Sequence, residues 1–160
     1  MSNLLRWLEF LGLSIWLSSD IFLSFIVAPG AFSILASRDQ AGAMVGYALT
    51  RMHWLGVICG ILVLLFRLLR TRSFTSLAAP AALSIALMIL LTVVSQLAIS
   101  SRMATLRVQM GSIQATAADS PLLAEFSRLH RISVSLESGV LLAGLAALFF
   151  FIRELASSSQ

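Results

Sequence analysis

Residues 80–99 read PAALSIALMILLTVVSQLAI and contain no charged side chain. A helix needs about 20 mostly apolar residues to cross the hydrocarbon core of a bilayer, so this stretch predicts one membrane-spanning helix. Three further mostly apolar stretches, each long enough to cross a bilayer, lie at residues 4–35, 41–66 and 121–152. We expect the third helix to continue amphipathically toward Met110. The first should bend or end near Pro29, because proline has no backbone N–H to donate.

The composition of the whole chain agrees with four spans. Hydrophobic residues make up 59% of the 160 residues and charged residues 11%, against about 45–50% and about 25% in soluble domains. The mean hydropathy is +0.96. These values exclude a disordered chain and predict an integral membrane protein with the lipid bilayer as its partner.

The basic residues carry information about partners and source. All 11 are arginines, and they stand in ones to threes between apolar runs, as at the ends of membrane spans. This spacing argues against nucleic acid as a partner. Arginine without lysine is typical of GC-rich bacterial genomes, so we expect the inner membrane of a bacterium.

An internal repeat organises the four spans. Residues 50–57 (TRMHWLGV) and 127–134 (SRLHRISV) share one pattern, and residues 13–17 (LSIWL) resemble residues 83–87 (LSIAL) in the same order. The order predicts a duplicated two-helix unit, with hairpins at about 4–72 and 80–153 related as parallel repeats. We therefore expect one all-α domain over residues 1–160, an integral membrane four-helix bundle.

The two histidines occupy equivalent positions in this repeat. His53 shares a helix face with Gly56 and Gly60, a glycine pair that allows close packing, so His53 should face the bundle. Two inward imidazoles at one depth have the chemistry to ligate a b-type haem or a metal ion. The alternative is that His53 and His130 only form hydrogen bonds. We expect no cofactor, with haem b as the alternative.

Two carboxylates lie inside predicted spans, Asp20 and Glu137. A charge at the bilayer centre costs about 2.5–3.5 kcal/mol, so each should face inward and find a partner. Candidate partners are the two histidines, Arg51 and Arg131. Gln96 belongs to a polar patch on the third helix with Thr92 and Ser95. These groups line either a proton pathway or a structural hydrogen-bond network.

The chain has no phosphate-binding glycine loop, nucleophile elbow or zinc-protease helix. We therefore expect a non-enzymatic protein, acting as a scaffold, an accessory subunit or a small-solute handler. One alternative is a haem redox protein using His53 and His130. A second is a proton-coupled carrier using Asp20 and Glu137, which would require a dimer. A homodimer or a membrane-complex partner is an expectation, and two glycine pairs, 42/46 and 56/60, offer packing faces inside the chain or between chains.

Three motifs carry a family resemblance that extends over nearly the whole chain. They are W-L-x4-F-x2-F-x-V-A-P-x2-F at residues 16–32, S-R-D-Q-A-G at 37–42, and F-x-R-x-H-x2-S at 126–133. With the helix-opening His53, they resemble the transmembrane protein 205-like family. The resemblance implies a four-helix membrane domain without established catalytic activity. Asp20 and Glu137 depart from the family pattern and add charge to the bundle. A more distant likeness is to copper-resistance protein D and the haem-bearing protoporphyrinogen oxidase HemJ.

Overall fold

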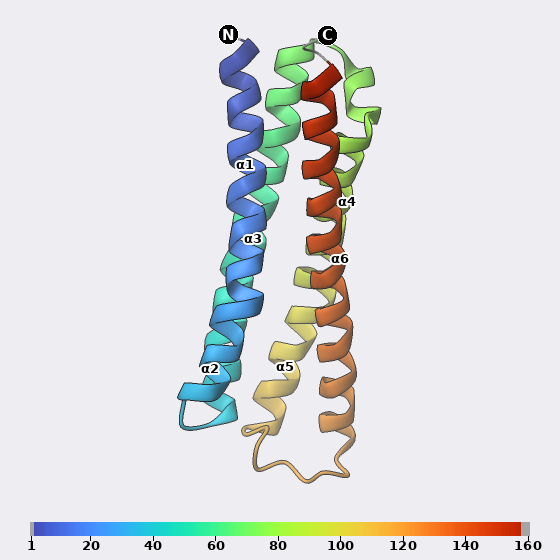
Figure 1. The fold of residues 1–160 in the computed structure, drawn as a ribbon. Coiled ribbons are helices and arrows are strands. Elements are labelled where there is room, and N and C mark those ends of the chain that lie inside the picture. The colour runs from blue at the N-terminus through green and yellow to red at the C-terminus, as the bar shows by residue number, and fades with distance from the viewer. Residues whose placement is uncertain (1, 158–160) are drawn as a thin grey trace.

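The computed structural model describes residues 2–157, and every regular element in this range is a helix (Figure 1). In chain order the elements are α1 (Ser2–Phe22), η1 (Leu23–Val27), α2 (Ala28–Ile34), α3 (Arg38–Thr71), η2 (Phe74–Ala78), α4 (Pro80–Val94), η3 (Ser95–Ser100), α5 (Ser101–Met110) and α6 (Pro121–Ser157). η1 and η3 are π-helical turns, and η2 is a 3-10 turn. The predicted all-α class is confirmed.

These elements join into four long apolar helices, Asn3–Ile34, Arg38–Thr71, Pro80–Met110 and Pro121–Ser157. At about 1.5 Å per residue, the shortest, of 31 residues, is about 46 Å long, which exceeds the roughly 30 Å hydrocarbon core of a bilayer. Each helix is long and apolar enough to span a membrane. The chain is therefore a multi-pass integral membrane protein, and the predicted four-helix bundle is confirmed.

The helices pair as two antiparallel hairpins. α1 packs along α3, α4 packs along α6, and α3 against α4 joins the pairs (Figure 1). Both chain ends lie at one end of the bundle, here called the terminal end, and residues 35–37 and 111–120 connect helices at the other, the loop end. The first helix of each hairpin contains one π-helical turn, and the duplicated unit stays a prediction.

The apolar core fills the terminal half of the bundle. Its largest side chain is Trp16, which is 1% exposed and packs with Leu13, Ile85 and Met88. The indole lies directly on the second glycine pair of α3: a Cβ at Gly60 would stand 2.6 Å from Trp16 Cζ3. This glycine pair therefore accommodates an aromatic side chain of the same subunit rather than a neighbouring helix backbone.

Two ion pairs close the terminal end. Arg70 Nε donates to Glu9 Oε1 at 2.6 Å, and Arg67 Nη2 donates to Glu154 Oε1 at 2.7 Å. They link α3 to α1 and to α6. The Glu9 side chain is completely buried, so its charge depends on Arg70 for compensation.

The start of α3 and the bend in the first span are set by local chemistry. Ser37 Oγ accepts the backbone N–H of Gln40 at 3.2 Å, which is the hydrogen bond of a serine N-cap. The prediction for Pro29 was only partly right, because the helix continues past it to Ile34. The irregularity lies in the π-helical turn η1, which ends two residues before this proline, the residue that has no backbone N–H to donate.

Candidate functional site

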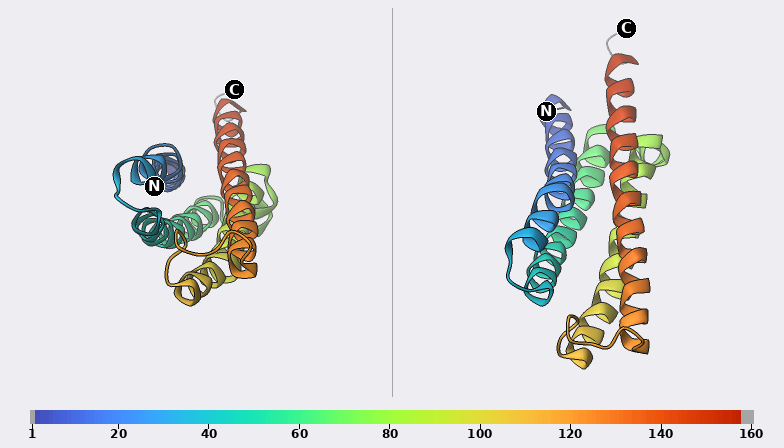
Figure 2. Two further views of the ribbon diagram at one scale, coloured as in Figure 1. Left: turned by 90° about the horizontal axis from the view of Figure 1, so that it is seen from below. Right: turned by 60° about the horizontal axis from the view of Figure 1, so that its bottom comes forward.

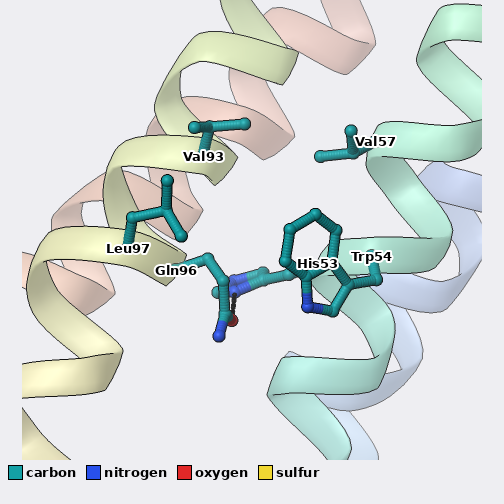
Figure 3. A pocket seen from close by; sticks show the side chains of 6 residues that line it. All are labelled: His53, Trp54, Val57, Val93, Gln96 and Leu97. Atoms are coloured by element: carbon teal, nitrogen blue, oxygen red, sulfur yellow. Dashed lines mark hydrogen bonds between the residues drawn. The ribbon is translucent and has the colours of Figure 1, made fainter.

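His53 is the centre of a buried polar network between the two hairpins. It comes from α3 and is 1% exposed. Its Nδ1 lies 2.8 Å from Oε1 of Gln96 in η3, and its Nε2 lies 2.7 Å from Oε1 of Glu137 in α6. Figure 3 shows the contact with Gln96, beside Trp54 and Val93. Ser95 Oγ donates to the same Glu137 oxygen at 3.0 Å.

This geometry requires a proton between His53 and Glu137. Both imidazole nitrogens face oxygen atoms, and a neutral imidazole has only one N–H. With the Gln96 oxygen toward the ring, either the imidazole donates from both nitrogens or the Glu137 carboxyl donates to Nε2. The pair therefore holds one exchangeable proton inside the bundle.

Asp20 supplies a second carboxylate from α1. It is 2% exposed, accepts a hydrogen bond from Ser24 Oγ at 3.3 Å, and interacts electrostatically with Glu137 and His53. Asp20 Oδ2 and Glu137 Oε2 are both buried without a hydrogen-bond partner in the described part of the chain. Unbonded buried carboxylate oxygens cost free energy unless a proton or a ligand satisfies them.

The network lies near the middle of the helices and is bordered by both π-helical turns. Glu137 is 16 residues from the start of α6 and 20 from its end, or about 24 and 30 Å. Ser24 belongs to η1, and Ser95 and Gln96 belong to η3. A π-helical turn places side chains where an unbroken α-helix would not, and such turns frequently mark functional sites.

A cavity of about 780 Å³ leads from the network toward the loop end. Its walls come from η1, α2, α3, η3, α5 and α6, and its polar lining includes Ser24, Thr50, Ser133 and Glu137. α2 contacts only η1 and α3, and does not contact α6. Figure 2 shows α2 and the beginning of α6 standing apart at this end. On that side we expect the cavity to face the bilayer, because it lies between helices long and apolar enough to span one.

Arg107 of α5 lines this cavity, although no sequence motif predicts a site there. A Cβ at Gly42 would lie 3.0 Å from its Nη2, and one at Gly46 would lie 3.3 Å from its Nη1. The first glycine pair of α3 thus admits a guanidinium group and is not a free helix-packing face. The sequence features that could have indicated this site are an arginine that follows an apolar span and a pair of glycines, Gly42 and Gly46, spaced by four residues.

The other candidate residues lie outside the network. Arg51 is exposed, and its guanidinium carbon stands 5.0 Å from the centre of the Tyr47 ring. Arg131 is also exposed, and no carboxylate of residues 2–157 lies within ion-pair distance of it. His130 is exposed and lines the cavity. The partner of Glu137 is therefore His53, one of the candidates, and neither arginine.

The two histidines do not face each other. Glu137, the residue opposite His53, follows His130 by seven residues, or about 10 Å along α6. Both ring nitrogens of His53 already have partners, and the crevice beside it is far too small for a porphyrin, at about 10 Å³. Among residues 2–157 no three His, Cys, Asp or Glu side chains are grouped to hold a metal ion. This geometry does not favour the haem alternative, which stays a prediction.

Comparison with known proteins identifies one family. A family model described as a domain of unknown function (DUF4149) matches residues 11–112, well over half of the chain. The matched region includes Asp20, His53, Gln96 and Arg107, whereas Glu137 lies beyond it. No curated protein and no solved structure matches the chain.

Proposed function

We propose that this chain, which belongs to the DUF4149 family, is a non-enzymatic membrane protein that binds a small solute between its two hairpins. One observation carries the proposal: Glu137 is both a wall of the cavity and the hydrogen-bond partner of His53. Through this residue the solute site and the buried proton site share one group. We further propose that the chain is related to the transmembrane protein 205-like family. Its proposed location is the inner membrane of a bacterium.

The cavity has the character of a small-molecule site. Its volume of about 780 Å³ falls within the roughly 300–1,000 Å³ usual for such sites, which combine a mostly apolar wall with a few polar groups. The aromatic residues Phe25, Phe32 and Phe126 contribute to the wall.

The network makes solute binding depend on protonation. When Glu137 is ionised, its unbonded oxygen opposes burial beneath an apolar solute, and protonation removes this cost. The other ionisable groups at this end of the cavity are His53, Asp20 and His130. Binding of the solute and of the proton are therefore coupled, and this coupling acts in both directions. A proton-coupled carrier, acting as a dimer, is the second candidate and rests on the same coupling.

A neutral fluorescent probe tests the proposal. The methyl ester of dansylundecanoic acid is titrated against the protein in phosphatidylcholine nanodiscs, with empty nanodiscs as background. We expect saturable binding that Ala43→Phe/Ala104→Phe abolishes, because both alanines line the cavity. The matched variant Ala86→Phe/Ala98→Phe carries the same change at exposed positions outside the cavity and should bind as wild type.

The same titration tests the link to protonation. We expect affinity to rise as pH falls, and Glu137→Gln to remove this dependence. Equal binding by the two alanine variants would reject the cavity as the site and leave a scaffold or accessory role. A pH dependence that survives in Glu137→Gln would reject the coupling.

A further inference from the structure

Arg107 stands near the membrane surface of the loop end, three residues before the end of α5. Its guanidinium lies on the backbone of α3 at Gly42 and Gly46, and its Cζ is 5.7 Å from the centre of the Phe126 ring. All four residues line the cavity. The cationic group is therefore held in one place by α3 on one side and an aromatic ring on another.

No carboxylate of residues 2–157 forms an ion pair with this guanidinium, whereas Arg67, Arg70 and Arg102 each pair with a glutamate. The nearby Asp39 carboxylate accepts hydrogen bonds from Ser112 Oγ and the Ile113 backbone N–H instead. Arg107 Nε is buried without a hydrogen-bond partner. The Asp39 carboxylate interacts with Arg107 electrostatically but forms no ion pair with it. A buried N–H without an acceptor is costly, and an anion on the guanidinium satisfies it with a short, charge-assisted hydrogen bond.

The wall beyond Arg107 is mostly apolar, with Thr50, His130 and Ser133 among its polar residues. Between Phe126, which meets Arg107, and Glu137 the helix rises through 11 residues, or about 16 Å. The apolar residues along this length of the cavity include Phe25, Met103 and Val134. We expect the side between α2 and α6 to face the bilayer. A charged group near the surface followed by an apolar path toward mid-membrane is the arrangement of an amphiphile within one leaflet.

We propose that the cavity binds a single-chain anionic amphiphile from the bilayer, with its carboxylate or phosphate on Arg107 and its alkyl chain directed toward Glu137. This inference rests on the proposed function and adds the class of solute. The volume of about 780 Å³ suits a ligand with one chain, since it is within the range of small-molecule pockets.

Three probes with the same dansyl-undecyl body test it: the carboxylic acid, its methyl ester and the corresponding amine. Each is titrated into nanodiscs of phosphatidylcholine at one fixed alkaline pH. We expect the acid to bind about tenfold to a hundredfold more tightly than the ester, the range for hydrogen bonds to a charged group. Arg107→Gln should remove this preference, and Arg107→Lys should keep part of it.

The ester separates this inference from the proposed function, because its binding does not depend on Arg107. Arg102→Gln is the matched control, since it removes an exposed arginine of the same helix that does not line the cavity. Ester binding without a preference for the acid would overturn the inference alone, as would tighter binding of the amine. If phosphatidylglycerol in the nanodiscs prevents the acid from binding, the cavity binds a two-chain anionic lipid. That result would also overturn the inference. Absence of ester binding at acidic as well as at alkaline pH would reject the proposed function.

Discussion

Replacing Glu137 by alanine is the most informative perturbation of the buried network. The substitution removes the hydrogen-bond partner of both His53 Nε2 and Ser95 Oγ, at 2.7 and 3.0 Å. Hydrogen bonds between membrane helices contribute about 0.6 kcal/mol on average and up to about 1.7. Two bonds therefore predict a loss of about 1.2–3.4 kcal/mol. Glu137→Gln keeps an acceptor oxygen in the same place and should lose less than about 1 kcal/mol.

Cys59 provides the assay. It is the only cysteine of the chain and is buried at 6% exposure, so a thiol-reactive coumarin reports its exposure when the protein is heated in detergent. For a chain of this length each kcal/mol corresponds to about 2–4 °C in Tm. We expect Glu137→Ala to lower Tm by about 2–14 °C, and Glu137→Gln by clearly less.

A double-mutant cycle with His53→Ala completes the test. Residues joined by a hydrogen bond show a coupling free energy of about 0.5 kcal/mol or more, whereas independent sites add within about 0.3–0.5. Additive effects of His53→Ala and Glu137→Ala, or equal Tm values for Glu137→Ala and Glu137→Gln, would refute the bond between His53 and Glu137.

Three further predictions use the same Cys59 assay. Gly56→Ala should lower the free energy of unfolding by about 1–3 kcal/mol, because the buried Trp16 indole must move away from α3. Gly30→Ala, with open space around it, should not destabilise the protein. Equal losses of stability in the two variants would contradict this packing. Arg70→Gln leaves a completely buried carboxylate without its partner and should cost several kcal/mol, whereas the exposed Arg102→Gln should change stability little; a loss no larger than that of Arg102→Gln would show that the buried pair contributes little. Asp20→Asn removes a buried charge of similar shape and should leave Tm unchanged or higher, and a large decrease would show that its ionised form is needed for folding.

Much of the fold followed from local sequence. The four spans and the continuation of the third helix to Met110 depend on hydropathy, and Ser37 caps α3 because its side chain lies three residues before the N–H it accepts. The inward stripe of the first helix was also predictable, since Glu9, Trp16 and Asp20 recur at helical spacing and are all buried. Periodicity within one helix sets which of its faces turns inward.

Only the tertiary structure decided which side chains of different helices bond to one another. The internal repeat placed His53 and His130 at equivalent positions, but His53 bonds to Glu137, 84 residues away in the chain. The cause is geometric: a side chain meets whatever the neighbouring helix presents at its own height, and that height depends on helix tilt, axial offset and the π-helical turns. None of these is recorded in the periodicity of a single helix. The same reason explains the cavity and the position of Arg107 against two glycines of α3, which depend on where the two hairpins separate.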